Sequence, residues 1–270
     1  MDGQLTFLGT GTSMGVPTLG CACAVCTSSD PHDRRLRPSA LISWRGPSSR
    51  TEPDARERIV VIDTGPDFRE QALRAGLTRV DAVLYTHSHA DHILGLDDLR
   101  PLSFTAFRES GPIPLYATAE TTAVLEHIFA YTFSPQATYP NRARVRLEPV
   151  AERNPIHGVD FLRVPVLHGE MEIVGYRFGS AAYLTDVSAI PEPSFALLEG
   201  LDHLVLSALR YKPHPSHATV DQALGWARRI GARQTWLTHI AHELAHEATN
   251  RTLPAGVALA YDGLTVPVTL

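Results

Sequence analysis

The stretch Thr86-His87-Ser88-His89-Ala90-Asp91-His92 lies between two short apolar runs, and it decides the fold of this chain. A buried strand that ends in a turn of ligand residues and then starts a helix holds those residues on a rigid scaffold. Side chains alternate along an extended segment, so His87 and His89 point the same way and can hold one metal ion. Asp91 and His92 turn back from the first helical turn and can hold a second ion. A polar loop that is rich in histidine by chance is the alternative, and four ligand residues within six positions argue against it.

Three later segments repeat this arrangement, because each is a run of apolar or β-branched residues that ends directly before a metal-ligand residue. Residues 161–167 precede His168, residues 181–185 precede Asp186, and residues 234–238 precede His239. Ligands at the ends of several strands converge at one edge of a sheet, where α/β folds place their sites. With the opening stretch they make seven ligands, enough for two ions, and we predict that Asp186 bridges the two.

The chain has 270 residues, of which 44% are hydrophobic and 20% are charged, as in ordinary globular proteins with a sizeable core. No repeat or low-complexity tract divides it, so we predict a single domain over residues 1–270. The net charge of -5 argues against a general affinity for nucleic acid or anionic membranes. No run is long enough to span a bilayer, and the N-terminus lacks the features of a signal peptide, so we expect a cytoplasmic protein.

Three cysteines, Cys21, Cys23 and Cys26, lie within six positions. An odd number of closely spaced cysteines in a cytosolic chain indicates a metal site rather than disulfides. A structural zinc takes four ligands, so one is missing locally. His242 could supply it, and His246, one helical turn further, is the rival. Three free, partly buried thiols are the alternative.

Apolar and β-branched runs predict further strands, and the helical spacing of apolar residues predicts helices. The strands are predicted over residues 5–8, 40–44, 59–62, 113–117 and 202–206. The helices are predicted over residues 67–75, 120–133 and 220–230, the last with a capping box of Thr219 and Gln222 and with Gly231 at its end. Residues 45–58 hold Gly, Pro, Ser and charges without an apolar period, and they predict an exposed hairpin loop.

Some polar segments leave two interpretations open. Asp63 follows a predicted strand, and it either caps the turn or accepts a hydrogen bond from a ligand histidine. The glycine-rich turn 9–15 is either a plain connector or a source of backbone N–H groups that face the site. Two groups of arginines are predicted to be solvated, one in a loop (Arg34, Arg35 and Arg37) and one on an edge strand (Arg142, Arg144 and Arg146).

The segment His-Ser-His-Ala-Asp-His resembles the His-x-His-x-Asp-His signature of the metallo-β-lactamase superfamily. The resemblance implies a four-layer αββα sandwich, with helices outside, two mixed sheets inside, and one or two metals at one edge of the sheets. The opening Gly-Thr-Gly-Thr-Ser, the Cys-x-Cys-x-x-Cys cluster, Thr-Asp and Leu-Thr-His-Ile-x-His are similar, in kind and order, to one branch of it. That branch contains the phosphoribosyl cyclic phosphate phosphodiesterases and is related to the tRNA 3′-processing endonucleases.

The resemblance implies a metal-dependent hydrolase of a small cyclic or linear phosphodiester, which a metal-bridging hydroxide attacks at a dinuclear site. Two divalent ions, manganese or zinc, would be held by His87, His89, Asp91, His92, His168, Asp186 and His239. A structural zinc would be held by Cys21, Cys23, Cys26 and His242. Asp91 would also orient the nucleophile, and His217 would bind the phosphoryl group or protonate the leaving alkoxide, unless it is a solvated loop residue. The expected partners are the small phosphodiester and, in a homodimer, a second copy; neither nucleic acid nor a membrane is expected.

The substrate and three rival functions stay open. Loop 45–58 is longer than the branch leads us to expect, and the predicted pocket loops at residues 104–110 and 211–214 carry no substrate signature. The rivals are a thioester or lactone hydrolase on the same metal centre, a pyrroloquinoline-quinone biosynthesis protein, and a non-catalytic protein with only a structural zinc. The second shares the cysteine cluster, but its active-site motif departs from the hydrolase pattern, whereas every ligand position is intact here.

Overall fold

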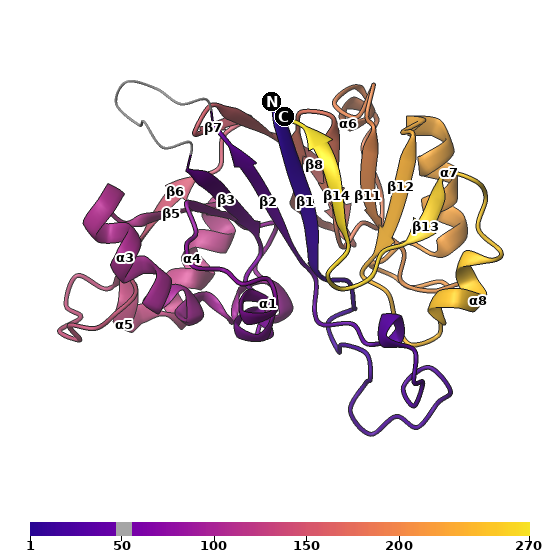
Figure 1. The fold of residues 1–270 in the computed structure, drawn as a ribbon, viewed down its shortest axis with the longest axis horizontal. Coiled ribbons are helices and arrows are strands. Elements are labelled where there is room, and N and C mark those ends of the chain that lie inside the picture. Colours follow the sequence, from indigo (N-terminus) through magenta and orange to yellow (C-terminus); the bar gives the residue numbers. More distant parts are fainter. Residues whose placement is uncertain (47–55) are drawn as a thin grey trace.

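Two seven-stranded sheets face each other at the centre of the structure, a computed structural model that describes residues 1–46 and 56–270 (Figure 1). Across the first sheet the strands are, in order, β14 (Thr265–Thr269), β1 (Asp2–Gly9), β2 (Ser39–Arg45), β3 (Glu57–Ile62), β4 (Ala82–Leu84), β5 (Ile113–Ala117) and β6 (Val145–Pro149). Neighbours are antiparallel from β14 to β3 and parallel from β3 to β6. The strands predicted over residues 5–8, 40–44, 59–62 and 113–117 are confirmed in this sheet.

The second sheet carries the remaining predicted strands. Its order is β13 (Val257–Leu259), β12 (Gln234–Thr238), β11 (His203–Ser207), β10 (Ala181–Leu184), β9 (Met171–Phe178), β8 (Val159–His168) and β7 (Arg153–Ile156). Neighbours are parallel from β13 to β10 and antiparallel from there to β7. Because β10, β11 and β12 run the same way, the residues that follow β10 and β12 meet at one edge of the sheet.

Helices cover the outer faces of both sheets (Figure 1). The helices and 3₁₀ turns are η1 (Pro31–Asp33), α1 (Phe68–Arg74), α2 (Ala90–Ile93), η2 (Leu96–Leu99), α3 (Arg100–Ser110), α4 (Ala119–Ile128), α5 (Ala130–Phe133), α6 (Glu192–Ala196), α7 (Val220–Ile230) and α8 (His246–Asn250). The predicted helices 67–75 and 220–230 are confirmed, the latter with its capping box. The predicted helix 120–133 is interrupted at Phe129, whose ψ of 39° separates α4 from α5. Residues 104–110 lie in α3, so the prediction of a pocket loop there is wrong.

Three apolar clusters hold the layers together. The central cluster lies between the sheets and joins Phe7 and Ile42 of the first to Phe161 of the second, all of them fully buried. A second cluster packs the helices beside β10–β12 on the second sheet, and a third packs α1, η2 and α4 on the first sheet. Apolar side chains on both faces of each sheet therefore build the four-layer αββα sandwich that the sequence predicts.

Arg35 corrects the prediction of a solvated loop, because its side chain is fully buried. Its guanidinium pairs with Asp33 over 3.2 Å and donates to the Leu244 carbonyl over 2.8 Å. Arg37 is partly exposed and pairs with Asp67 over 2.7 Å. A buried arginine needs such partners, and they tie the loop before β2 to the segment after β12.

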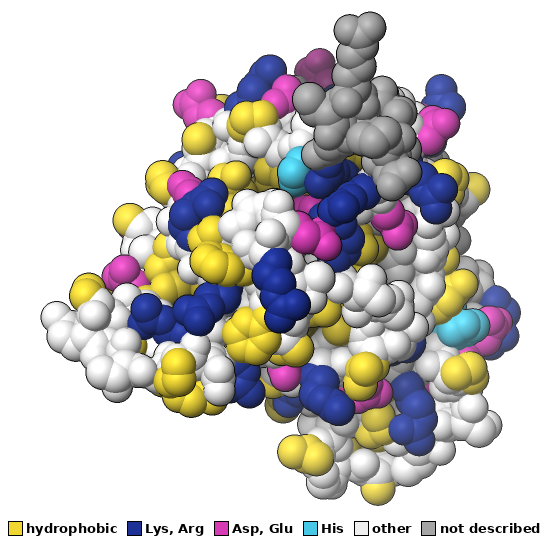
Figure 2. All heavy atoms as spheres, turned by 60° about the vertical axis from the view of Figure 1, so that its left-hand side comes forward, with side chains coloured by type: hydrophobic (Ala, Val, Ile, Leu, Met, Phe, Trp, Pro, Cys, Tyr) yellow, Lys and Arg dark blue, Asp and Glu magenta, His cyan; other side chains and the backbone are white. Residues whose placement is uncertain are grey.

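The arginines before and on β6 lie on the side of the molecule that carries α3 and α5. Arg144 lies over the ring of Phe107, 5.8 Å from its centroid, and Arg142 donates to the carbonyl of Ser134 over 3.4 Å. Figure 2 shows this side, on which Arg and hydrophobic side chains are interspersed. The arginines that predicted a solvated edge strand are therefore partly engaged in packing at the surface.

Two further expectations concern loop 45–58 and the membrane. Residues 47–55 of the predicted hairpin loop lie outside the described residues, while Arg45 and Glu57 on either side of it pair across β2 and β3. Among the helices of residues 1–46 and 56–270, none has the length and apolar character needed to span a bilayer.

Candidate metal centre

The seven residues predicted to hold two metals lie together at one edge of the sheets, at or just after the ends of β4, β8, β10 and β12. They form two groups, within each of which the candidate ligand atoms are no more than 4.8 Å apart. The first group is His87, His89 and His168. His87 Nε2 and His89 Nδ1 are 3.0 Å apart, which suits neighbouring ligands of one ion with bonds of about 2.1 Å.

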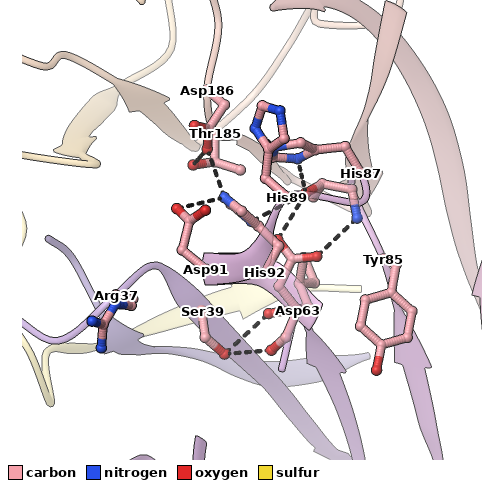
Figure 3. A network of polar contacts seen from close by, with 12 residues as sticks. Arg37, Ser39, Asp63, Tyr85, His87, His89, Asp91, His92, Thr185 and Asp186 are labelled. Carbon is pink, nitrogen blue, oxygen red and sulfur yellow. Dashed lines mark hydrogen bonds and ion pairs between the residues drawn. The ribbon is translucent and has the colours of Figure 1, made fainter. Parts of the chain in front are cut away.

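The second group is Asp91, His92, Asp186 and His239, and all four side chains are buried. His92 Nε2 points between two carboxylates, 3.2 Å from Asp91 Oδ2 and 3.2 Å from Asp186 Oδ2 (Figure 3). His239 Nε2 lies 3.0 Å from Asp186 Oδ1. Asp186 also groups with His168. It therefore has the position between the two groups that the predicted bridge requires.

Three residues at this edge have a left-handed backbone although none is glycine. The φ angles are 62° at Asp63, 56° at Asp186 and 56° at His239. Asp63 and His239 directly follow β3 and β12, and one residue separates Asp186 from β10. The left-handed conformation turns the chain sharply where each strand ends, but it strains a residue with a side chain by about 1–3 kcal/mol. The surrounding hydrogen bonds and packing must hold it in place.

Asp63 is fully buried and supports the second group from beneath. His92 Nδ1 donates to Asp63 Oδ2 over 2.7 Å, and the Thr86 backbone N–H and hydroxyl donate to the same carboxylate over 2.8 Å each (Figure 3). Of the two interpretations left open for Asp63, the structure therefore favours the acceptor from a candidate ligand. With its proton on Nδ1, His92 directs the lone pair of Nε2 into the site. His168 is oriented similarly, because its Nδ1 donates to the Ser216 carbonyl over 2.7 Å.

The residues fit divalent cations because the imidazole nitrogens of the second group face carboxylates without a well-aligned hydrogen bond. Among the described residues, no well-aligned hydrogen bond reaches His92 Nε2 or either ring nitrogen of His239, although carboxylate oxygens lie 3.0–3.2 Å from both Nε2 atoms. Burial alone would lower the pKa of both histidines, but Asp186 and the neighbouring carboxylates raise the pKa of His92 well above its usual value and that of His239 to about 9. The carboxylates thus favour positive charge in the site, which a divalent ion would supply. Unpartnered imidazoles facing buried carboxylates are the donor set of a divalent metal.

Two glycines allow the backbone of α2 to pack closely against the turn after β3. A Cβ on Gly65 would lie 2.0 Å from the Asp91 carbonyl oxygen, and one on Gly95 would lie 2.0 Å from the Gly65 carbonyl oxygen.

We expect Gly65→Ala to displace Asp91, to lower the free energy of unfolding by about 1–3 kcal/mol, and to reduce metal content. Denaturant unfolding and elemental analysis measure the two effects. Gly225→Ala, where a Cβ meets open space, is the control, and undiminished metal in Gly65→Ala would contradict the prediction.

His217 lies beside both groups. Its Nδ1 is 3.6 Å from Asp186 Oδ1, and its ring stacks on that of His239 with centroids 4.8 Å apart. Burial, and then the charge of His239, lower the pKa of His217 to about 3, so the ring is neutral at neutral pH. A neutral imidazole can donate a hydrogen bond to a phosphoryl oxygen. The contact with Asp186 argues against a solvated loop residue, while the role of His217 stays a prediction.

Three groups around the site were not predicted from the sequence. They are the Thr86 hydroxyl, the Ser216 carbonyl and His214, whose ring lies 4.9 Å from that of His217. The two histidines of His-Pro-Ser-His, three positions apart, are a signal that could have indicated His214. No local pattern marks a backbone carbonyl. The glycine-rich turn 9–15, by contrast, acts as a connector, because the N–H groups of Thr10, Gly11 and Thr12 bond to other segments.

The three cysteines lie beside His242, and not beside His246, in the structure. His242 Nδ1 lies 3.2 Å from Cys21 Sγ, 3.3 Å from Cys23 Sγ and 3.6 Å from Cys26 Sγ, as around a tetrahedral zinc with bonds of about 2.0–2.3 Å. The Cys26 backbone N–H lowers the pKa of Cys23 to about 6, whereas burial raises the pKa of Cys26 to about 11. The four residues fit a zinc ion, which would join the loop before β2 to the loop that follows β12.

Cys23→Ser is expected to lower zinc content and thermal stability together, because a closed zinc site contributes folding free energy directly. A loss of about 2 kcal/mol would lower Tm by roughly 4–8 °C for a chain of this size. Calorimetry and elemental analysis check both quantities. Ala24→Ser, an exposed change in the same loop, should leave both unchanged. If Cys23→Ser behaved like Ala24→Ser, the assignment of the zinc site would be wrong.

Comparison with known proteins identifies the family to which this chain belongs. A family model described as a β-lactamase superfamily domain matches residues 58–240. A crystal structure described as a new diphosphatase from the PhnP family is 53% identical, covers 100% of this chain and 99% of its own, and superposes with a TM-score of 0.90.

Two curated relatives are longer than this chain. An octanoyltransferase of Porphyromonas gingivalis is 39% identical over 261 residues, which are 95% of this chain and 50% of that protein. A coenzyme PQQ synthesis protein B of Methylobacterium nodulans is 34% identical over 136 residues, which are 47% of this chain and 40% of that protein. The chain thus spans half or less of these relatives. The family model and the fully covered crystal structure are decisive: the chain belongs to the β-lactamase superfamily and, within it, to the PhnP family.

Proposed function

We propose that this chain hydrolyses a small phosphoric diester, either a cyclic or linear phosphodiester or a diester of diphosphate, at a dinuclear metal site. The observation that carries the proposal is the position of Asp186 between two groups of candidate ligand atoms, with His217 beside it. The 53% identical relative described as a diphosphatase supports a phosphoryl substrate. We further propose manganese or zinc at this site and zinc at the cysteines.

Two divalent ions bound there would acidify a water molecule and withdraw charge from the phosphoryl oxygens. Burial opposes ionisation of Asp91, but His92 and His239 hold the pKa of its carboxyl far below the usual range, so it is ionised. As a carboxylate it would bind a metal ion and orient the attacking water. His217 donates its N–H to the phosphoryl group or to the leaving oxygen. The water oxygen bonds to phosphorus, the bond from phosphorus to the leaving oxygen breaks, and that oxygen takes up a proton.

Thioester hydrolysis on the same centre is the second candidate. It is favoured by the 39% identical relative named octanoyltransferase, since acyl transfer uses an activated acyl group. This chain spans only half of that protein, so the transferase activity can belong to the other half. The phosphoryl proposal has the support of a relative that this chain covers almost completely.

Purified protein supplied with manganese tests the proposal on a panel of substrates. We expect hydrolysis of bis-p-nitrophenyl phosphate, and no hydrolysis of a p-nitrophenyl thioester or of a γ-lactone. The reverse pattern would select the second candidate. Elemental analysis of the same sample separates an enzyme from a binding protein, because three ions per chain fit the enzyme and a single ion at the cysteines fits a protein with only a structural zinc.

A further inference from the structure

The segment from Arg210 to His217 forms a loop whose ends are fixed beside the candidate metal centre. A β-bridge joins Arg210 to Thr219, and the Leu209 N–H donates to the Ala218 carbonyl over 3.0 Å. Inside the loop, the Ser216 carbonyl accepts a hydrogen bond from His168 Nδ1 over 2.7 Å. The loop that lacked a substrate signature in the sequence is therefore held by a candidate metal ligand.

His214 is held in this loop as a neutral hydrogen-bond donor. The Ser216 backbone N–H donates to His214 Nδ1 over 3.3 Å, so Nδ1 carries a lone pair and the proton of the neutral ring resides on Nε2. The rings of His239, His217 and His214 follow one another with centroid distances of 4.8 Å and 4.9 Å. The first is buried and the last is half exposed, so His214 is the outermost ring of the series.

Lys212 adds a free positive charge to the same loop. It is the single lysine in a chain whose other basic residues are arginines. Arg210 is neutralised by Glu243 over 3.2 Å and donates to the Lys212 carbonyl over 3.3 Å, whereas no acidic side chain in the described part of the protein pairs with the exposed Lys212. The loop thus carries one N–H donor whose ring lies 4.9 Å from that of His217, and one exposed cation two positions before that donor.

We propose that His214 and Lys212 bind the phosphoryl group adjacent to the one that is attacked, and that they select diphosphate diesters over simple phosphodiesters. This inference rests on the proposed function of the metal centre. Rings in series, as His217 and His214 are, can each reach one of two phosphoryl groups joined through a single oxygen. In the reaction the water oxygen bonds to one phosphorus and the P–O bond to the bridging oxygen breaks. The second phosphoryl group leaves as a phosphate monoester, whose developing charge the Nε2–H and the ammonium group stabilise.

Two substrates with the same substituents test the selection: bis-p-nitrophenyl phosphate and P1,P2-bis-p-nitrophenyl diphosphate, with products followed by chromatography. We expect His214→Ala to raise KM for the diphosphate about tenfold, the effect of one hydrogen bond to a charged group, and to change the monophosphate diester less than about twofold. His214→Gln keeps an N–H donor near the place of Nε2 and should restore much of the loss. Lys212→Ala should act in the same direction, and Lys212→Arg should not.

A binding measurement keeps the test independent of turnover. Titration calorimetry of methylenediphosphonate and of methylphosphonate into the manganese-loaded protein should show weaker diphosphonate binding in His214→Ala, and unchanged binding in His127→Ala, an exposed histidine on α4. If the wild type hydrolysed neither ester, the proposed function would fail, whereas the calorimetric comparison would still decide on His214. Equal losses on both substrates, or none on either, would overturn the inference while leaving the proposed function intact.

Discussion

Asp186→Ala is expected to lose both active-site metals and to hydrolyse its substrate at least about 10⁴-fold more slowly than the wild type. Asp186 alone among the candidate carboxylates groups with ligands of both halves, namely His168 on one side and His92 with His239 on the other. Its removal leaves each half one ligand short. Both ions should therefore leave together, and the chemistry they supply should leave with them.

Elemental analysis and the initial rate on bis-p-nitrophenyl phosphate measure the two losses in the same sample. Circular dichroism should show a folded protein, because Asp186 contributes to no apolar cluster. Asp160→Ala is the matched control, since it removes an exposed carboxylate at the opposite end of β8 from His168. A variant at Asp186 that retained one ion and substantial activity would show that Asp186 does not bridge.

His217→Ala is expected to keep both ions and to lose rate by about 10²–10⁴-fold on a diester with an alkyl leaving group. The imidazole lies outside the seven predicted ligands, so its loss should act on the phosphoryl group or the leaving oxygen. The effect should shrink for p-nitrophenolate, which needs little protonation. Metal content and kcat on the two diesters measure the separation.

The outcome on the two leaving groups decides the role of His217. An equal loss on both would indicate that its N–H binds the phosphoryl group without delivering a proton, as a neutral ring would. No loss on either would return it to a solvated loop residue. If the ions left with the side chain, His217 would be a metal ligand, a role that its position near His168 and Asp186 also permits.

The layers of the fold follow from local patterns, but several boundaries do not. Runs such as 59–62 and 234–238 predict strands because they are rich in apolar or β-branched residues, which favour strands. The break between α4 and α5 at Phe129 and the burial of Arg35 depend on contacts made far away in the chain. Arg35 is stabilised by a carbonyl of Leu244, 209 positions along the chain, and no local signal distinguishes it from its solvated neighbours.

The candidate ligands could be predicted from the sequence because each of them lies at the end of a strand or in the segment that follows it. The groups that hydrogen-bond to these ligands could not be predicted from the sequence, because they are backbone groups or short polar side chains that tertiary contacts bring close. The Ser216 carbonyl that orients His168 is 48 positions away, and the contact between Gly65 and Asp91 is one of packing alone. The roles of the ligands, and the single domain that length and composition predict, stay predictions.

The left-handed backbone at Asp63, Asp186 and His239 bears on how cells handle this protein before it acquires metal. Three such residues together store about 3–9 kcal/mol of strain, against a net stability of about 5–15 kcal/mol for a typical domain. Bound metal stabilises the native state by mass action, so the strain weighs most on the metal-free chain. Proteases act on the fraction that is transiently unfolded. We expect chains that fail to acquire metal to be degraded first, so the strained edge would act as a quality control on metal loading.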